Sequence, residues 1–290
     1  MHREITAVDG RTLHYSLCGP EDGSRVVLHN GTPGTRFLSR RWIELIEQIG
    51  VRVLVPDRPG YGGSTRQPDR SVDNVATDVA QMADAQGWKT FSTWGASGGG
   101  PHALACAARL RQRVTRCAVV VSLAPYNGYG LDWFGGMSPG NIQEFKQALK
   151  GEATYRPLVE RLSRQALAQL DQGEPAIPPG YDVPKSDLEE MRRRLAADAT
   201  GFVERTRRAW IDGKDGWIDD CIAMVRPWGF DVAKISIPVS IWYGQDDVLS
   251  PRSHAEWLIA NIPGAERREM TGGHMFSDDY LSEILRWVTA

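Results

Sequence analysis

The sequence predicts an α/β protein with a mostly parallel sheet and one helical insertion. Short, nearly all-apolar strand patterns alternate with helical patterns over residues 1–124, give way to helical spacing alone over 125–229, and resume over 230–290. Strands that are apolar on both faces are typical of a parallel sheet covered by helices on both sides. We therefore expect a core of residues 1–124 and 230–290, with residues 125–229 as a helical cap over the strand ends.

The first part of the core is expected to begin with a hairpin and to continue with strands that alternate with helices. Two alternating runs, EITAV and TLHYSLC, flank Asp9-Gly10, a dipeptide typical of a hairpin turn. Further strands are expected at SRVVLHN, VRVLVPD, TFSTW and VTRCAVVVSL. Helices are expected around 42–49, over 72–86 and directly after Ser97, because apolar residues recur there at helical spacing.

The cap is expected to contain helices over 139–151, 155–172, 185–197 and 200–212. The last two carry six arginines, which we interpret as a solvated helix face balanced by neighbouring acidic residues. The core then resumes with the strand IPVSIWYG, a helix over 253–262, the strand ERREM and a closing helix over 278–288.

The composition argues against several classes of protein. A net charge of -2 over 290 residues shows no bias toward nucleic acid or an anionic membrane. The start, MHREITAVDG, lacks the apolar stretch of a signal peptide, and the longest apolar run, 117–125, is shorter than the ~20 residues that span a bilayer. The four cysteines show no metal-site spacing. We therefore expect a cytoplasmic protein without disulfides, metal or organic cofactor that acts on a small molecule, as a monomer or a dimer.

The segment GASGG places Ser97 in a G-x-S-x-G pattern between a strand and a helix. On such a turn the serine backbone is strained and the hydroxyl stands above the sheet, so the neighbouring residues must be small. The free N–H groups of the following helix favour negative charge, and the Gly98 N–H is placed to stabilise an oxyanion. A simpler interpretation is a glycine turn whose serine only caps the helix. The strand, turn and helix around Ser97 favour a nucleophile.

A serine nucleophile needs a base, and His274 has the most suitable position among the six histidines. It lies in MTGGHMF, between the last strand and the last helix, and this loop opens on the same sheet edge as Ser97 because parallel strands end together there. Among the others, we expect His29 to support a loop, His102 to point away from the serine, and His254 to begin a surface helix.

The base in turn needs an acid, and the active site needs a second oxyanion donor. The segment WYGQDDVLSP follows a strand and supplies Asp246 and Asp247, which gives the order Ser, Asp, His along the chain. The second donor is expected in the loop VVLHNGTPGT, where we predict the backbone N–H of Thr32. GTPG can also be read as a tight turn, and the turn is what directs this N–H inward.

The chain resembles the α/β-hydrolase fold superfamily, and the resemblance covers essentially all of it. The matching stretches are HNGTPG, PDRPGYGGS, GASGGG, GQDDVLSP and GGH. The resemblance is strongest to capped serine hydrolases of the proline iminopeptidase and epoxide hydrolase branch. It implies a mostly parallel central sheet flanked by helices, with an inserted helical cap.

The resemblance also distinguishes between the two aspartates. In this superfamily the acid usually stands three residues after a strand-end glycine, with a proline four residues further on, and Gly244, Asp247 and Pro251 match that spacing. Asp247 is therefore preferred to Asp246. The family usually has a histidine where this chain has Asn30, which changes the support of the oxyanion loop but leaves its backbone role intact.

Three functions are compatible with these residues. The first is an esterase or lactonase that cleaves a small-to-medium apolar carboxylic ester through an acyl-enzyme, which can also pass the acyl group to an alcohol or amine. The second is an aminopeptidase or amidase resembling proline iminopeptidase, with a cap carboxylate such as Glu144, Glu152 or Glu204 to hold a substrate ammonium. The third is a non-catalytic member of the fold that binds a small ligand. Epoxide hydrolases and haloalkane dehalogenases use an aspartate nucleophile, so Ser97 argues against both chemistries.

The first segment of the cap, 125–134, follows a strand end directly and is expected to lie near the predicted site. Its aromatic side chains predict a substrate pocket for an apolar group: Tyr126, Tyr129, Trp133 and Phe134. The alternative is that these rings form the cap's own core.

Overall fold

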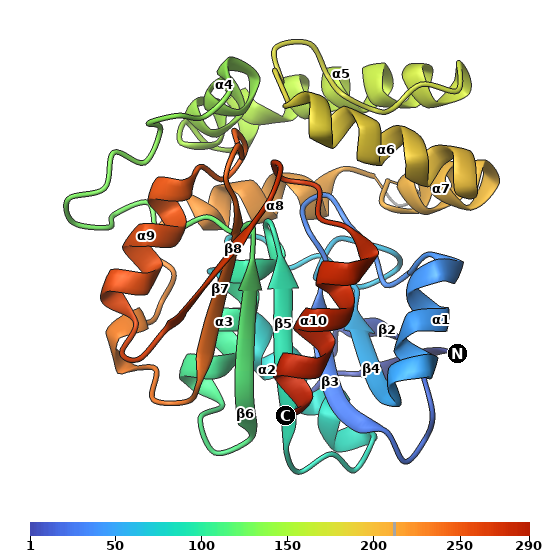
Figure 1. Ribbon diagram of the computed structural model, residues 1–290, viewed down its shortest axis with the longest axis vertical. Coiled ribbons are helices and arrows are strands. Elements are labelled where there is room, and N and C mark those ends of the chain that lie inside the picture. Colours follow the sequence, from blue (N-terminus) through green and yellow to red (C-terminus); the bar gives the residue numbers. More distant parts are fainter. Residues whose placement is uncertain (211–212) are drawn as a thin grey trace.

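The computed structural model describes residues 1–210 and 213–290, and it confirms the predicted α/β class. These residues form an eight-stranded sheet with the order β1-β2-β4-β3-β5-β6-β7-β8 (Figure 1). The strands are β1 (His2–Thr6), β2 (Thr12–Cys18), β3 (Ser24–His29), β4 (Val51–Pro56), β5 (Phe91–Ala96), β6 (Val114–Val120), β7 (Val239–Gly244) and β8 (Glu266–Met270). Strands β3 to β8 run parallel, whereas β1 and β2 pair antiparallel at one edge.

The hairpin at the sheet edge forms where the sequence predicts it. Thr6 pairs with Thr12 across the turn, and Gly10 has a positive φ of 84°, a conformation that glycine adopts without strain. This hairpin covers the outer edge of β4, so β3 and β5, which lead to Thr32 and Ser97, lie in the interior of the sheet.

Helices cover both faces of the sheet. On one face, α1 (Arg40–Ile49) and α10 (Asp278–Thr289) pack over a cluster that includes Leu28, Val53 and Trp94. On the other face lie α2 (Asn74–Ala85), α3 (Gly99–Arg109), α9 (Arg252–Asn261) and the short 3-10 helix η1 (Val232–Lys234). Buried apolar side chains on both sheet faces explain why the central strands read as continuous apolar runs.

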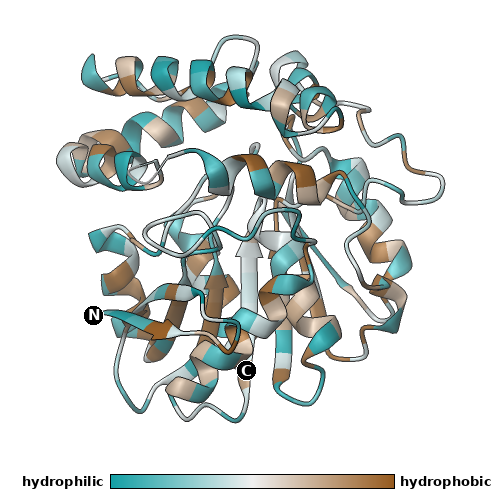
Figure 2. Cartoon of the chain, turned by 180° about the vertical axis from the view of Figure 1, so that it is seen from behind, coloured by the Kyte–Doolittle hydropathy of each residue, from teal (hydrophilic) through white to brown (hydrophobic). Residues whose placement is uncertain are grey.

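The residues between β6 and β7 form a layer of helices above the C-terminal ends of the strands (Figure 1). They are α4 (Pro139–Ala148), α5 (Glu152–Asp171), α6 (Lys185–Ala197), α7 (Ala199–Arg208) and α8 (Asp215–Met224). A separate apolar cluster, which includes Phe145, Val159 and Ile218, holds α4, α5 and α8 together. Figure 2 shows hydrophobic residues along the strands and mainly hydrophilic residues on the uppermost helices. We call residues 125–229 the insertion.

The helices of the insertion depart from the sequence prediction in four places. The helix expected over 139–151 ends at Ala148. α5 begins at Glu152, three residues earlier than expected, and α8 was not predicted. The helix expected over 200–212 ends at Arg208, and positions 211 and 212 lie outside the described residues. Within the described residues, no helix combines the length with the apolar composition that crossing a bilayer requires.

Helix α3 lies unusually close to the sheet because small residues stand at the contact. A Cβ on Gly99 would lie 2.0 Å from the carbonyl oxygen of His29 in β3, and a Cβ on Gly95 would lie 2.2 Å from the Gly99 oxygen. Both obstacles are backbone atoms, which cannot move without shifting the strand or the helix. The two glycines therefore fix the height of α3 above the strand ends.

We expect Gly99→Ala to destabilise the fold more than Gly10→Ala. The first substitution forces a methyl group into backbone and should cost about 3 kcal/mol. At Gly10 no atom lies within 4 Å of the added Cβ, so only the positive φ opposes the substitution, at about 1 kcal/mol. Urea unfolding of both variants measures the difference, and equal losses of unfolding free energy would contradict the close approach of α3.

Candidate active site

Ser97 occupies the sharp turn between β5 and α3. Its φ of 53° lies in the left-handed region, which is uncommon for a residue with a side chain and marks local strain. The turn is held by a hydrogen bond from the Ser97 N–H to the Val120 oxygen (2.9 Å) and one from the Gly100 N–H to the Ser97 oxygen (2.9 Å). Gly98, not Ser97, is the N-cap of α3, and no side chain caps this helix. The interpretation of Ser97 as a simple helix cap therefore does not describe this turn.

The predicted oxyanion donors, Thr32 and Gly98, lie in contact with each other beside Ser97. A Cβ on Gly98 would lie 3.2 Å from the Thr32 nitrogen, and a Cβ on Gly31 would lie 3.9 Å from the Ser97 hydroxyl oxygen. The N–H groups of Thr32 and Gly98 donate no hydrogen bond to any described residue. Two unpaired backbone donors beside a serine hydroxyl are the arrangement that an oxyanion requires.

A buried ion pair holds the loop that carries Thr32. Arg58, which directly follows the aspartate at the end of β4, forms a bidentate pair with Asp220 of α8, with nitrogen–oxygen distances of 2.6 Å and 3.1 Å. The Thr32 hydroxyl donates to the same carboxylate at 2.7 Å. Arg58 also donates to the carbonyl oxygens of Asn30 (2.6 Å) and Gly31 (2.8 Å). Arg58 therefore fixes the loop carbonyls while Asp220 fixes the Thr32 side chain.

Asp220 remains ionised although its side chain is completely buried. Burial alone would raise the pKa of this carboxyl, but the charges of Arg58 and Arg70 hold the pKa well below its usual range. Arg70 donates to it at 2.6 Å and the Tyr61 hydroxyl at 3.0 Å. A buried charge with this many donors is paired rather than free to act as a general base.

His102 lies below the same cluster and contributes to its geometry. Its Nδ1 lies 2.8 Å from the Gly98 oxygen, while Nε2 lies 3.7 Å from the Asp220 carboxylate. Burial and the nearby Arg58 charge lower the pKa of His102 to about 3, so the imidazole is neutral near pH 7. The contact with the Gly98 peptide makes His102 a support of the turn at Ser97.

His274 and Asp247 lie together in the arrangement expected for a base and its orienting acid. His274 Nδ1 lies 2.8 Å from Asp247 Oδ2, and Asp247 Oδ1 accepts the backbone N–H groups of Leu249 (2.8 Å) and Ser250 (2.9 Å). One carboxylate oxygen is thus fixed by its own loop, which aims the other at the imidazole. Asp246 is exposed and only its backbone N–H is engaged, with the Gly272 oxygen at 2.9 Å.

The electrostatic surroundings of His274 favour its charged form. Burial would lower the pKa of His274, but the charge and the hydrogen bond of Asp247, with a further contribution from Asp187, raise the pKa above its ordinary value of 6.5. An imidazole with a raised pKa is a stronger base and a better holder of the proton that a serine releases.

The loop that carries His274 folds back toward β5. Phe276, two residues after His274, packs edge-on against Trp94 of β5, with 6.5 Å between ring centroids. Ser97 lies three residues after Trp94, at the same end of the sheet. Within the described residues, no hydrogen bond joins His274 to Ser97, and in ligand-free enzymes this bond is often long and shortens when substrate binds.

A cavity of about 310 Å³ opens above Ser97 between the sheet and the insertion. Ser97, Gly98 and Thr32 line one end. The remaining wall is mostly apolar and comes chiefly from the insertion; it includes Leu123, Phe145, Ala166, Pro178, Met191, Phe202, Trp210, Trp217, Met224 and Leu249. The cavity therefore suits a compact apolar group whose reacting atom reaches Ser97.

Glu144 of α4 is the acidic side chain in this wall. It is 5% exposed and accepts hydrogen bonds from the hydroxyls of Tyr155 and Tyr181 and from the Trp217 indole at 2.7 Å. No arginine, lysine or histidine of the described residues forms a salt bridge with it. The carboxylate is thus satisfied by neutral donors. The other two acids proposed for an ammonium, Glu152 and Glu204, do not line the cavity; Glu152 pairs with arginines and Glu204 is exposed.

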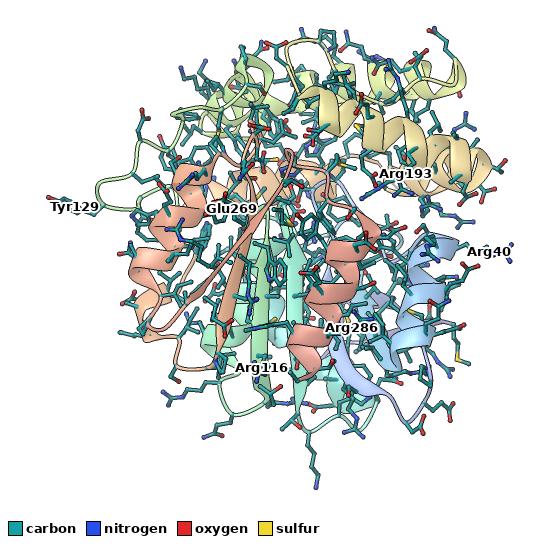
Figure 3. The ribbon with its side chains drawn as sticks, in the orientation of Figure 1. Arg40, Arg116, Tyr129, Arg193, Glu269 and Arg286 are labelled. Carbon is teal, nitrogen blue, oxygen red and sulfur yellow. The ribbon has the colours of Figure 1, made fainter. Side chains whose placement is uncertain are left out.

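The four aromatic residues predicted to line the pocket do not do so, and this expectation is corrected. Tyr129 is 98% exposed and points away from the molecule (Figure 3). Trp133 is buried, with its indole N–H donating to the Ala124 oxygen at 2.8 Å. Tyr126 and Phe134 pack edge-on against Trp133. The rings of Tyr126, Trp133 and Phe134 pack on one another instead of lining the cavity.

Two further sequence expectations also change. His254 does not begin a surface helix, because its side chain is fully buried between the Ala124 N–H (3.0 Å) and the Trp133 oxygen (2.9 Å). The arginine-rich face of the insertion is only partly solvated, since Arg194 reaches the Phe276 oxygen in the core. Both residues connect the insertion to the core.

Sequence reasoning missed the charged residues that support the site. Arg58 stands in PDRPGYGGS, a stretch that matched the family, but no role was assigned to it. Asp220 lies in WIDDCIAM, where two acids interrupt an apolar run, a pattern that indicates a paired buried charge. Asp187, which contacts the His274 loop, has no local signal. No group of three or more metal-binding side chains is suitably placed within the described part of the chain.

Comparisons with known proteins identify the fold family of this chain. A family model described as the alpha/beta hydrolase fold matches residues 24–279. The chain is 26% identical to a non-heme chloroperoxidase of Streptomyces lividans over 87% of this chain and 84% of that protein. It is 30% identical to the bifunctional esterase/perhydrolase DCH of Acinetobacter calcoaceticus, over 85% of this chain and 83% of that protein.

Solved structures show the same fold. An esterase from Exiguobacterium antarcticum superposes with a TM-score of 0.70 over all of both chains at 19% identity. The family match and the curated relatives together support a hydrolase. From the sheet order, the turn at Ser97 and the match over most of its length, the chain belongs to the α/β hydrolase fold family.

Proposed function

We propose that this protein is a serine hydrolase that cleaves small-to-medium apolar carboxylic esters, including lactones, through an acyl-enzyme. The observation that carries the proposal is the strained Ser97, whose hydroxyl faces a mostly apolar cavity beside two unpaired backbone N–H groups. Strain of this kind persists only where the surrounding structure holds it, and it occurs preferentially at active sites. The similarity to the esterase/perhydrolase of Acinetobacter calcoaceticus supports the same class.

In the proposed mechanism, Ser97 Oγ attacks the ester carbonyl while His274 takes the hydroxyl proton. The negative oxygen of the tetrahedral intermediate is held by the N–H groups of Thr32 and Gly98. Collapse breaks the bond to the alcohol, which leaves with the proton from His274. His274 then takes a proton from water, whose oxygen attacks the acyl group and releases the carboxylic acid and Ser97. Asp247 orients His274 and stabilises its charged form throughout.

The cavity suggests which esters fit. A volume of about 310 Å³ is at the lower end for small-molecule sites and matches an acyl group of modest size. The Glu144 carboxylate gives the wall a negative charge with no basic partner among the described residues. The carboxylate would repel an anionic acyl group, whereas an uncharged acyl group would bind without this electrostatic cost. We therefore infer uncharged esters as substrates.

A second candidate is an aminopeptidase or amidase, and Glu144 is the observation that favours it. A buried carboxylate in the cavity could hold a substrate ammonium near the reacting bond. Its oxygens already accept hydrogen bonds from Tyr155, Tyr181 and Trp217, so an ammonium would have to share them. Because the Glu144 oxygens are already occupied by these donors, we prefer an ester to an amine-bearing peptide as the substrate. A non-catalytic ligand-binding protein is the third candidate, and the experiment below separates it from both enzymes.

We expect a fluorophosphonate to add once to the wild-type protein and not to Ser97→Ala, as measured by intact mass. Ser64→Ala is the matched control, because Ser64 also stands next to a glycine but its hydroxyl donates to the Asp57 backbone oxygen at 2.9 Å. This variant should label like the wild type. A folded wild-type protein that takes up no adduct would overturn the serine hydrolase proposal and leave the ligand-binding candidate.

The labelling rate should rise with pH through an inflection above 6.5. His274 must be neutral to take the proton. Its pKa is raised above 6.5, so the neutral base is lost as the pH falls through this raised pKa. Asp247→Asn should lower the rate by about 10⁴-fold and move the inflection to lower pH, since it removes the charge that stabilises the imidazolium. Asp246→Asn, which alters the exposed neighbour, should leave both unchanged. Equal effects of the two variants would argue against Asp247 as the orienting acid.

Glu144→Gln should reduce the discrimination against negatively charged substrates. We expect the wild type to hydrolyse an aryl ester with a terminal methyl group about 10 to 100-fold faster than the analogue with a terminal carboxylate, measured as kcat/KM. The ratio should fall in Glu144→Gln and stay constant in Glu152→Gln, whose carboxylate pairs with Arg66 outside the cavity. A prolyl anilide, assayed alongside the esters, tests the aminopeptidase alternative. Turnover of the anilide but not of the esters would favour the aminopeptidase.

A further inference from the structure

A buried aspartate of the insertion holds the backbone of the residue proposed as the base. Asp187, in the first turn of α6, is 1% exposed. Its Oδ2 accepts the N–H of His274 at 2.8 Å, and its Oδ1 accepts the N–H of Met275 at 3.0 Å. Both carboxylate oxygens are therefore used on two consecutive peptide groups of the core. Asp187 thus engages the backbone of His274, whereas Asp247 engages its side chain.

Helix α6 makes further contacts with the same loop, residues 271–277 between β8 and α10, which we call the base loop. Arg194 donates to the Phe276 oxygen. A Cβ on Gly273 would lie 2.7 Å from both Asp187 oxygens, and one on Gly272 would lie 3.4 Å from the Ser186 hydroxyl oxygen. The loop is thus pressed against the helix along most of its length. Figure 1 shows it rising from the sheet toward the layer of insertion helices.

The base loop needs this partner because its own backbone leaves the two N–H groups without an acceptor. A buried N–H without a hydrogen bond costs free energy, so the loop keeps its shape only while an acceptor is present. In the structure that acceptor comes from a residue 87 positions earlier in the chain, on a helix of the insertion. Any displacement of α6 would therefore release the peptide groups of His274 and Met275 together.

We propose that Asp187 is a positioning residue for His274, and that the base is held in its working position only when α6 is docked on the base loop. The inference rests on the proposed function, because it assigns a role in the same reaction. It also gives the insertion a part in catalysis beyond forming the cavity wall.

The charged groups around the imidazole make the role measurable. Asp247 faces His274 from the loop after β7, and Asp187 faces it from α6; both favour the charged imidazole. Two further charged groups lie near the base loop. Arg194 of α6 donates to the Phe276 oxygen, and Asp278 Oδ2 at the start of α10 lies 3.3 Å from Arg41 Nε. Loss of the Asp187 charge should therefore lower the pKa of His274 and leave its hydrogen bond to Asp247 intact.

The test compares Asp187→Asn with Glu189→Gln on the same helix. Among the described residues, Glu189 forms an ion pair only with the exposed Lys185, at 3.3 Å, so Glu189→Gln removes one negative charge from α6 without a contact to the base loop. We expect Asp187→Asn to lower kcat for an aryl ester by about 100-fold with little change in KM, and to move the pH inflection of the labelling rate downward. Glu189→Gln should behave like the wild type. A wild-type pH profile and rate in Asp187→Asn would overturn the proposal.

A second measurement does not depend on activity. Hydrogen exchange of the peptide that contains His274 and Met275 should be about tenfold faster in Asp187→Asn than in the wild type and unchanged in Glu189→Gln. If Asp187→Asn fails to fold, Arg194→Met removes the contacts with the Phe276 oxygen and ring, together with the ion pair to Glu190 on the same helix. It leaves the Asp187 carboxylate in place and should show a smaller acceleration. No acceleration in either folded variant would overturn the inference. Faster exchange in a protein whose wild type takes no fluorophosphonate would instead overturn the proposed function and leave the contact established.

Discussion

The architecture of the site depends on one buried ion pair, Arg58 with Asp220. Both side chains are essentially inaccessible to water, and they join the end of β4 to a helix of the insertion. Removing one partner of such a pair leaves an uncompensated charge and typically costs about 3–5 kcal/mol. The pair also sets the oxyanion loop, because the Asn30 and Gly31 carbonyls and the Thr32 hydroxyl have no freedom left once it forms. Stability and geometry are therefore supplied by the same contacts.

The site divides into two halves with one principle in common. On the side of β3 and β5, Asp220 holds the loop beside Ser97; on the side of β8, Asp187 holds the loop of His274. In each half the group proposed to react comes from the end of a core strand, and the buried acid that holds its loop comes from the insertion. The cavity above Ser97 is mostly apolar, which suits the uncharged ester proposed as the substrate.

The sequence predicts the features that local pattern determines. The hairpin at Gly10, the strands of the core and the turn at Ser97 follow from alternation, glycine and the order of elements, and the described fold confirms them. The supporting charges do not follow, because Asp187 and Asp220 find their partners across 87 and 162 positions. The prediction that the aromatic segment after β6 lines the pocket is wrong for a different reason. Composition does not distinguish a ring such as Trp133 that packs in a cluster from one that lines a cavity.

The position of Asp220 on α8 and Asp187 on α6 also bears on how such proteins diversify. An insertion that only covered the strand ends could be exchanged between relatives as an interchangeable part. Here two of its acids complete loops that belong to the core, so a recombined chain carrying a foreign insertion would inherit Arg58 without its counter-ion. Replacement of residues 125–229 as one block would therefore remove both contacts, whereas substitutions in the cavity wall would leave them in place.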